Sequence, residues 1–250
     1  MQVMKNFLIV LTNLTVFPLL IIMTIIGIFI SPLAFICFKI IGRNDTVHII
    51  RLFVWIYGRG WLAITQPFTG IRTFGLKKGD IKTPCIIVPN HLSFFDTFFM
   101  GALPFNNVCF AIRAWPFKMA WYRPFMKLAQ YLDVESLPWN ESFKLSKKVL
   151  SDGGALLFFP EAHRSRDGNL GRFYSGAFKI SVATGVPIVP LCITGTDKLL
   201  PPGRWYLKPA RVKLKALPPV DPTDFTGENS HIEMRKYVKS LIAHELKQMR

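Results

Sequence analysis

Short apolar runs alternate with longer amphipathic segments over most of the chain. Apolar runs bounded by turn or charged residues predict buried strands at residues 85–88, 108–112, 155–159, 186–193 and 212–214, after a strand and turn at 69–78. Helices are expected at residues 97–103, 145–150, 175–184 and 232–249, the last being a charged helix with a solvated face. Strands that alternate with helices at this spacing predict an α/β fold, with a mostly parallel central sheet flanked by helices.

The N-terminal segment has a different pattern. Residues 7–38 carry no charged side chain, and Pro18 and Ser31-Pro32 interrupt the run. A helix of this length would measure about 48 Å, which exceeds the roughly 30 Å of a bilayer core. The run therefore predicts either one tilted membrane helix that stops near Ser31 or a hairpin of two shorter helices.

Two further segments combine aromatic residues with cations. Residues 46–64 include Arg51 and Arg59 among apolar residues and predict an interfacial amphipathic helix, with an ordinary core helix as the alternative. Residues 115–128 are also basic and aromatic, which suits the headgroup layer of a bilayer. The expected organisation is an N-terminal membrane-embedded helical segment with its interfacial helix, residues 1–64, followed by an α/β domain, residues 65–250.

Composition favours a lipid surface as the partner. Half of the residues are hydrophobic, and 31 Lys and Arg against 15 Asp and Glu give a net charge of +16. A basic, hydrophobic chain suits an anionic membrane surface, whereas no nucleic-acid-binding module is recognisable in the sequence. Cations such as Lys39 follow the apolar run, so the globular part is expected on the cytoplasmic face of the cell inner membrane.

The cysteine pattern predicts neither a disulfide nor a metal site. No CxxC pair occurs, and no histidine stands at ligand spacing from a cysteine. Reduced, buried thiols in apolar surroundings are therefore expected at all four cysteines, Cys37, Cys85, Cys109 and Cys192.

His91 and Asp96 lie at a predicted strand-to-helix junction, a common location for catalytic side chains in α/β folds. On one continuous helix they would lie on different faces, because five residues turn about 500°. They can meet only if His91 is in the loop and Asp96 is in the first helical turn. The carboxylate would then accept the imidazole Nδ1–H and leave Nε2 available as a base.

A structural interpretation of the same stretch is equally open. Ser93-Phe94-Phe95-Asp96 matches the capping-box pattern, in which Ser93 caps the helix and Asp96 binds back to it. The two interpretations are compatible, because a cap at Ser93 would place the helix start where the His91–Asp96 pairing requires it.

A second polar cluster follows the predicted strand at residues 155–159. Glu161, His163 and Arg164 stand at the same kind of strand end as His91. The planar guanidinium of Arg164 suits phosphate or carboxylate, and Glu161 could hold that arginine or accept a substrate hydroxyl. The alternative is a structural ion pair at a turn.

Four motifs occur in one order along the chain: Asn90-His91-x4-Asp96, Arg113, Phe159-Pro160-Glu161-x-x-Arg164-Ser165, and Val186-Pro187-Ile188-Val189-Pro190. This ordered set, within residues 70–217, resembles the glycerolipid acyltransferase superfamily, specifically the 1-acyl-glycerol-3-phosphate (lysophosphatidate) acyltransferases. The resemblance implies transfer of a fatty acyl group to the free hydroxyl of a lysophospholipid at the membrane surface. The donor would be acyl-CoA or acyl carrier protein, with no bound cofactor and no metal.

The resemblance also implies roles for individual residues. It makes His91 the general base and Asp96 its orienting partner, and it makes Glu161 and Arg164 the pair that binds the acceptor. The other substrate-site residues of these motifs are Arg113, His163 and Ser165. The acyl-binding side of the site would be shaped by Val186, Pro187 and Ile188.

Such a site needs no nucleophilic side chain, because a thioester is already activated toward an alcohol. His91 would remove the proton of the acceptor hydroxyl as it attacks. Backbone N–H groups near the start of the following helix would stabilise the oxyanion.

Several positions depart from the usual family pattern. Ala162 and His163 replace Gly and Thr of Glu-Gly-Thr-Arg-Ser, Tyr174 follows Phe173 in place of Lys, and Glu135 stands where Arg is usual. A nearby Glu135 would oppose the charge of a phosphate monoester. A lyso-ornithine lipid or a zwitterionic lysophospholipid is therefore an alternative acceptor. A non-catalytic membrane-surface lipid-binding protein is the alternative from another functional class.

Overall fold

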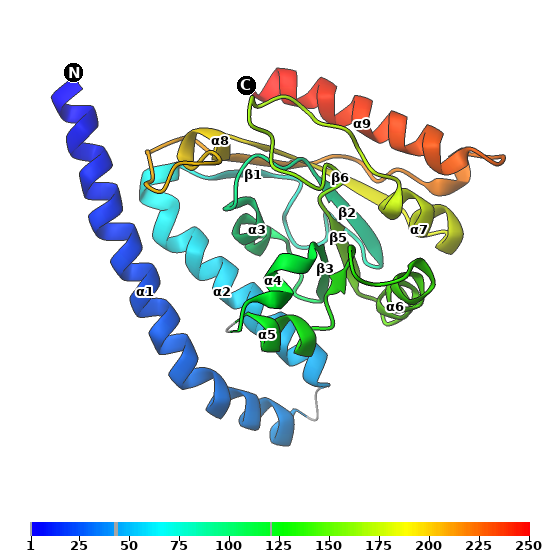
Figure 1. The fold of residues 1–250 in the computed structure, drawn as a ribbon, viewed down its shortest axis with the longest axis horizontal. Coiled ribbons are helices and arrows are strands. Elements are labelled where there is room, and N and C mark those ends of the chain that lie inside the picture. The colour runs from blue at the N-terminus through cyan, green and yellow to red at the C-terminus, as the bar shows by residue number, and fades with distance from the viewer. Residues whose placement is uncertain (1, 43–44, 121) are drawn as a thin grey trace.

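A seven-stranded sheet forms the centre of the protein, as a computed structural model that describes residues 2–42, 45–120 and 122–250 shows (Figure 1). The strand order is β1-β7-β6-β2-β5-β3-β4. The strands are β1 (Arg72–Phe74), β2 (Cys85–Pro89), β3 (Val108–Ile112), β4 (Leu132–Asp133), β5 (Ala155–Phe158), β6 (Ile188–Thr194) and β7 (Lys213–Ala216). Only the β6–β7 pair is antiparallel, so the predicted α/β fold with a mostly parallel sheet is confirmed.

The central strands are fully buried, which explains why the sequence shows them as continuous apolar runs. Helices lie around the sheet, and α6, α7 and α9 contact β5, β2 and β6 respectively. The helical elements of this part are α3 (Asp96–Phe99), η1 (Met100–Ala102), α4 (Ala114–Lys118), α5 (Arg123–Leu128), α6 (Trp139–Ser151), α7 (Gly176–Thr184), α8 (Thr196–Leu199), η2 (Pro222–Asp224) and α9 (Ser230–Met249).

The sequence predicted a charged, solvated helix at residues 232–249, but one face of α9 is buried. Its residues Met234, Val238, Ile242 and Leu246 recur every four positions and are buried. This spacing places them on one face of a helix, and that face packs against β6. The charged residues between them occupy the opposite face, so the helix is amphipathic and covers part of the core.

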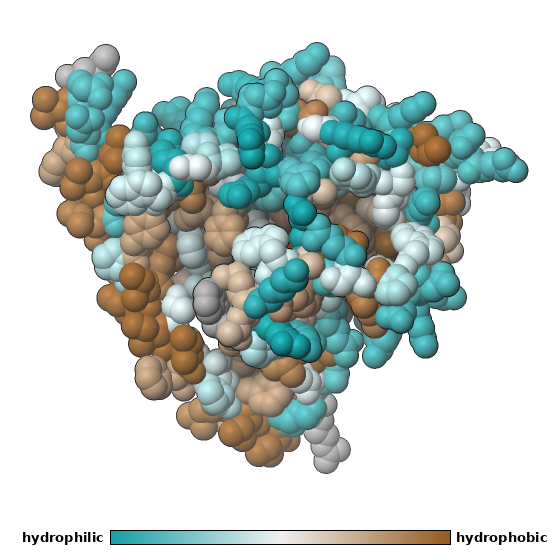
Figure 2. All heavy atoms as spheres, in the orientation of Figure 1, coloured by the Kyte–Doolittle hydropathy of each residue, from teal (hydrophilic) through white to brown (hydrophobic). Residues whose placement is uncertain are grey.

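The N-terminal apolar run forms one helix, α1 (Gln2–Ile41), which continues through both Pro18 and Pro32. The expected break near Ser31 and the hairpin of two shorter helices within this run are therefore wrong. Most large apolar side chains of α1 are exposed, and Figure 2 shows them gathered along its outer surface. By length and composition, α1 and α2 (Thr46–Thr69) could each cross a membrane, which points to membrane association.

Helix α2 runs back along α1 and packs against the helical turns that follow the His91 loop (Figure 1). The backbones come very close at Gly58 and Gly101, where a Cβ on Gly101 would lie 2.5 Å from the Gly58 carbonyl carbon. Arg51 is buried and donates to the Ala129 carbonyl and the Asn107 side chain, so it does not serve as an interfacial cation. The predicted helix at 46–64 is thus confirmed, with one face packed on the α/β part.

Candidate active site

His91 and Asp96 meet at the carboxyl end of β2. His91 Nδ1 lies 2.9 Å from Asp96 Oδ2, and the Asp96 side chain is fully buried while 16% of the His91 side chain is exposed. His91 lies in the loop after β2, and Asp96 is the first residue of α3. The structure therefore has the arrangement that allows the pair to form. Nε2 takes no part in this bond and is the nitrogen that can act on a substrate.

The same carboxylate also organises the backbone of the loop. Asp96 Oδ2 accepts hydrogen bonds from the amides of Leu92, at 2.6 Å, and Ser93, at 2.8 Å. The Ser93 hydroxyl accepts from the Phe95 amide and donates to the Leu200 carbonyl. Phe95, not Ser93, stands at the N-cap of α3 and makes no side-chain cap. Of the two capping-box bonds, the structure contains the one from the Ser93 amide to the Asp96 carboxylate. The same carboxylate also pairs with His91, so the capping and pairing interpretations are compatible.

Both backbone polar groups of His91 are held by the loop that follows β5. The His91 amide donates to Glu161 Oε1 at 2.8 Å, and the His91 carbonyl accepts from the Ser165 amide at 2.8 Å. Glu161 Oε2 accepts from the Gly171 amide at 2.6 Å. Glu161 thus binds two backbone amides rather than the Arg164 guanidinium, and its role in this structure is to position His91.

Burial raises the pKa of Glu161, while the hydrogen bonds from the Gly171 and His91 amides act in the opposite direction. The aromatic ring of Phe159 packs on the imidazole, with ring centroids 4.2 Å apart. Asn90 fixes the base of the loop, because its side chain exchanges hydrogen bonds with both backbone groups of Ile193 on β6. Asn90 and Gly171 were not assigned roles from the sequence, since their partners lie far away in the chain.

Three motif residues from separate loops form a polar cluster on the same edge. Arg113 Nε donates to Glu135 Oε1 at 2.6 Å, and Arg113 Nη1 lies 3.0 Å from His163 Nδ1. Glu135 Oε2 also accepts from the Ala114 amide, and this bond, followed by the one from Arg113, lowers the pKa of Glu135. Glu135 therefore neutralises part of the positive charge that Arg113 would otherwise offer.

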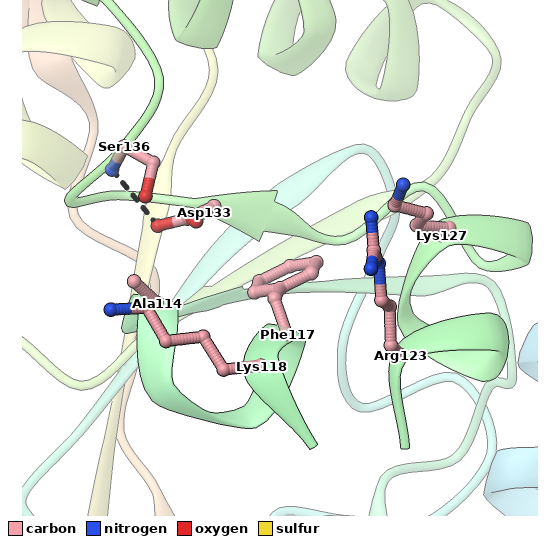
Figure 3. A pocket seen from close by; sticks show the side chains of 7 residues that line it. All are labelled: Ala114, Phe117, Lys118, Arg123, Lys127, Asp133 and Ser136. Atoms are coloured by element: carbon pink, nitrogen blue, oxygen red, sulfur yellow. Dashed lines mark hydrogen bonds between the residues drawn. The ribbon is translucent and has the colours of Figure 1, made fainter. Parts of the chain in front are cut away.

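Arg164 and Ser165 line a shallow depression beside Glu161, of about 360 Å³. Arg164 is exposed, while the Ser165 hydroxyl donates to Asp167. On the far side of the Arg113 cluster lies a second groove, of about 510 Å³, lined by Phe117, Lys118, Arg123 and Lys127 among others (Figure 3). The Arg123 and Lys127 side chains lie beside each other there. Lys118, Arg123 and Lys127 of the basic segment at 115–128 thus line a cationic groove that begins at Ala114, next to Arg113, whereas Trp121 of that segment lies outside the described residues.

The three residues expected to line the acyl pocket lie elsewhere. Ile188 pairs with Ile86 near the start of β2, whereas Pro89, close to His91, pairs with Leu191. Three strand residues span about 10 Å. Val186, Pro187 and Ile188 therefore lie at the amino end of β6, whereas His91 follows the carboxyl end of the neighbouring strand β2. Ile188 is also fully buried in the core. The structure does not bring these residues to the site.

The buried thiols do not supply a nucleophile. Desolvation raises the pKa of Cys85 and Cys192 to about 12 and that of Cys109 to about 11, so each stays protonated near neutral pH. Cys37, by contrast, is exposed on α1, contrary to the expectation that it is buried. Within the described ranges, no group of three or more His, Cys, Asp or Glu side chains could hold a metal ion.

A loop histidine held by a buried aspartate, at the carboxyl edge of a parallel sheet, defines an α/β protein equipped for general-base chemistry. Residues 70–194 match the family model described as Acyltransferase. The chain therefore belongs to the acyltransferase family.

Similar proteins support the same family. The 1-acyl-sn-glycerol-3-phosphate acyltransferase BAT2 of Brassica napus, a chloroplast protein, is 33% identical over 61% of this chain and 46% of its own length. A protein of that enzyme name from Limnanthes douglasii is 30% identical over 79% of this chain and 69% of its own. The chain spans about half the length of the curated relatives that match it first.

Among solved structures, the crystal structure of the 1-acyl-sn-glycerophosphate (LPA) acyltransferase PlsC from Thermotoga maritima has a TM-score of 0.78 to this chain. The match covers 98% of this chain and 97% of that one at 23% identity. The two proteins therefore share a fold over nearly the whole of both chains.

Replacing Glu161 with glutamine should slow turnover through His91 rather than through acceptor binding. A glutamine side chain has one acceptor oxygen, so it cannot hold the amides of both His91 and Gly171. Displacement of a catalytic group by about 1 Å can cost about 10²-fold in rate. We expect kcat to fall by about that factor while KM for the acceptor changes little. A large rise in KM with unchanged kcat would instead assign Glu161 to acceptor binding.

Proposed function

We propose that this protein is a membrane-bound O-acyltransferase. It moves a fatty acyl group from acyl-CoA or acyl carrier protein to the free hydroxyl of a lysophospholipid. The first candidate acceptor is 1-acyl-glycerol-3-phosphate, which would give phosphatidate for phospholipid biosynthesis. The observation that carries this proposal is the His91–Asp96 pair, 2.9 Å apart, in a chain of the acyltransferase family.

The pair supports a direct transfer without a covalent enzyme intermediate. Nε2 of His91 takes the proton of the acceptor hydroxyl while its oxygen attacks the thioester carbonyl carbon. The resulting imidazolium is stabilised by Asp96 through Nδ1. The carbon–sulfur bond then breaks, and the thiolate leaves with the proton from His91. No bound cofactor is needed, since the thioester supplies the activated acyl group.

Two amides of the loop just before α3 are not available to the oxyanion. The N–H groups of Leu92 and Ser93 both donate to Asp96. Arg164 is exposed beside the Glu161 loop and is the residue to which we assign the anionic part of the acceptor.

A test of this function uses the purified full-length protein with lysolipids and acyl donors of both kinds. Mass spectrometry should detect a product that is heavier than the lysolipid by one acyl group, together with the free thiol of the donor. The same mixture with His91→Ala is the control for uncatalysed transfer. Binding of lysolipids without any acylated product, across the panel, would favour the non-catalytic lipid-binding alternative.

The Arg113–Glu135–His163 cluster supports a second candidate acceptor. The Arg113 guanidinium is already bound to the Glu135 carboxylate at 2.6 Å, so its charge is partly neutralised. A phosphate monoester carries close to two negative charges near neutral pH and would be opposed by Glu135. A zwitterionic or amino-acid-containing lysolipid, whose ammonium group could face Glu135, is therefore the alternative acceptor.

Glu135→Arg should shift the acceptor preference severalfold toward 1-acyl-glycerol-3-phosphate in competition with a zwitterionic lysolipid. The substitution replaces an opposing charge with an attractive one beside Arg113. Competition is measured from the ratio of the two products in one reaction. Glu228→Arg, at an exposed position in the loop before α9, makes the same charge change as a control. An unchanged ratio in Glu135→Arg would show that the cluster does not face the headgroup.

The packing of α1 favours attachment to one leaflet over a membrane span. Thr12, Val16 and Leu20 of α1 are buried against the rest of the molecule, and Phe38 packs on Phe53 of α2. These contacts are about 39 Å apart along the helix. A spanning α1 would therefore draw the α/β part into the bilayer. We place α1 along the cytoplasmic leaflet of the inner membrane, which labelling of Lys5 from each side of sealed vesicles can test.

A further inference from the structure

The loop between α8 and β7 exposes an unusual combination of residues. Its sequence from position 200 is Leu-Pro-Pro-Gly-Arg-Trp-Tyr-Leu-Lys-Pro-Ala-Arg. The Trp205 side chain is 83% exposed, as much as Val3 near the end of the apolar helix α1. Arg204 and Lys208 flank it. Tryptophan beside cations is the pairing that membrane–water interfaces favour, because the ring is amphipathic and the cations attract anionic headgroups.

The loop is held in shape by its own contacts. Arg204 Nε donates to the Tyr206 carbonyl at 2.9 Å, and the Lys208 amide donates to the Leu199 carbonyl at 3.1 Å. The Arg204 guanidinium and the Lys208 ammonium both lie over the Tyr206 ring, and the Trp205 ring meets Tyr206 edge-on. Trp205 is therefore presented by an ordered turn of the chain while its own surface stays uncovered.

A polar residue of the apolar helix fixes this loop against α1. Asn13 Nδ2 donates to the Leu207 carbonyl at 2.8 Å, and Asn13 Oδ1 accepts from the Leu207 amide at 2.8 Å. An unpaired amide in hydrocarbon would be costly, so this two-way bond gives Asn13 a structural purpose in a stretch without charged side chains. The bond places the loop beside the exposed apolar surface of α1, including Val10 and Leu14.

The other end of the loop is tied to the catalytic segment. The Ser93 hydroxyl, two residues after His91, donates to the Leu200 carbonyl at 2.6 Å. The stretch from Leu200 to Leu207 thus links the His91 loop to α1 through two hydrogen-bonded contacts. Anything that holds this loop also fixes the position of the candidate active site relative to α1.

We propose that the Leu200–Lys208 loop is a second membrane contact, in which Trp205 enters the headgroup region of an anionic lipid surface. This proposal rests on the membrane attachment through α1 that belongs to the proposed function. Continuity with the apolar surface of α1 and the positive charge of Arg204 and Lys208 select a lipid surface as the partner. The contact orients the candidate active site toward the bilayer from which a lysolipid comes.

The test measures whether Trp205 lies in the lipid. The full-length protein is reconstituted into phosphatidylcholine–phosphatidylglycerol vesicles with bromine atoms near the headgroup end of the acyl chains. Trp205→Phe keeps an apolar ring and removes one of the six tryptophans. The difference in emission between the wild type and this variant reports on Trp205 alone. We expect this difference to be strongly quenched by the brominated lipids and unquenched in vesicles without bromine.

A matched control and a second variant complete the experiment. Trp139→Phe is the matched control, because Trp139 is 47% exposed and belongs to α6, which lies away from α1 in Figure 1. The difference in emission between the wild type and Trp139→Phe should not be quenched by bromine. Asn13→Leu keeps α1 apolar but removes both bonds to Leu207, and it should reduce the quenching of Trp205. Equal signals for Trp205 with and without bromine, in protein that co-sediments with the vesicles, would overturn the proposal and favour a protein partner at this loop.

This measurement separates the loop from the proposed chemistry. Quenching requires no turnover, so a protein that acylates nothing could still show Trp205 in the lipid. An active enzyme whose Trp205 stays unquenched would refute the loop contact alone. Protein that fails to co-sediment with vesicles would refute the membrane attachment on which both rest.

Discussion

His91→Ala is expected to lower the rate of acyl transfer by about 10² to 10⁴, the usual contribution of a general base. The imidazole is the only part of His91 that the substitution removes. Its backbone amide and carbonyl still bind Glu161 and the Ser165 amide, so the loop should keep its course. The rate is measured with saturating donor and acceptor, and folding is followed by thermal melting of the same preparation.

The matched control for this variant is His244→Ala, which removes an exposed histidine from α9. It should leave the rate unchanged. Near-normal activity in His91→Ala would refute the mechanism, because no other described histidine pairs with the buried Asp96. Loss of activity together with loss of the folded state would be resolved by His91→Gln, which keeps a polar side chain of similar length.

Asp96→Asn is expected to reduce activity about as far as His91→Ala while the protein stays folded. The uncharged amide cannot stabilise the imidazolium, and loss of the equivalent group in a serine protease costs about 10⁴ in kcat. All three bonds to this side chain end on Oδ2, and the asparagine oxygen can take that place, so the loop can keep its bonds from the Leu92 and Ser93 amides. Turnover and melting temperature are measured on the same sample.

The opposite result would identify Asp96 as a structural residue. In that case the melting temperature would drop, and activity per folded molecule would hold. Ser93→Ala provides the comparison, because it disturbs the same loop by removing the hydroxyl bonds to Phe95 and Leu200 without touching the charge. Equal losses of activity in Ser93→Ala and Asp96→Asn would mean that loop geometry, not the carboxylate charge, sets the rate.

Features that depend on neighbours in the chain were predictable from the sequence. The buried strands β2, β3, β5 and β6 are continuous apolar runs because their residues are covered on both faces. Gly185, which ends α7 in a left-handed conformation with φ of 70°, marks a helix end that local pattern also predicts. The His91–Asp96 pair belongs here too, because five residues across a strand-to-helix junction limit where the two side chains can meet.

Prolines and charges were less reliable guides than these local patterns. Pro18 and Pro32 predicted breaks in α1, yet the helix continues through both. The many charged residues of α9 predicted a solvated helix, yet one of its faces is buried. Arg51 was expected at a membrane interface, yet it is buried and donates to Ala129 and Asn107. For α9 and Arg51, packing against a distant part of the chain decided which side chains are buried, and local pattern does not show such packing.

The sequence by itself determined the α/β class and the main strands, and it predicted His91 and Asp96 as a candidate pair. Only the tertiary structure decided what surrounds that pair. Glu161 stands 70 positions from His91, yet its side chain accepts from the His91 amide. Asn13 stands 194 positions from Leu207, yet its side chain accepts from the Leu207 amide. Such contacts depend on which strands lie side by side and in what register. That choice is set by burial of the whole core, so no local pattern could show that Glu161 positions His91 or that Val186–Ile188 lie away from it.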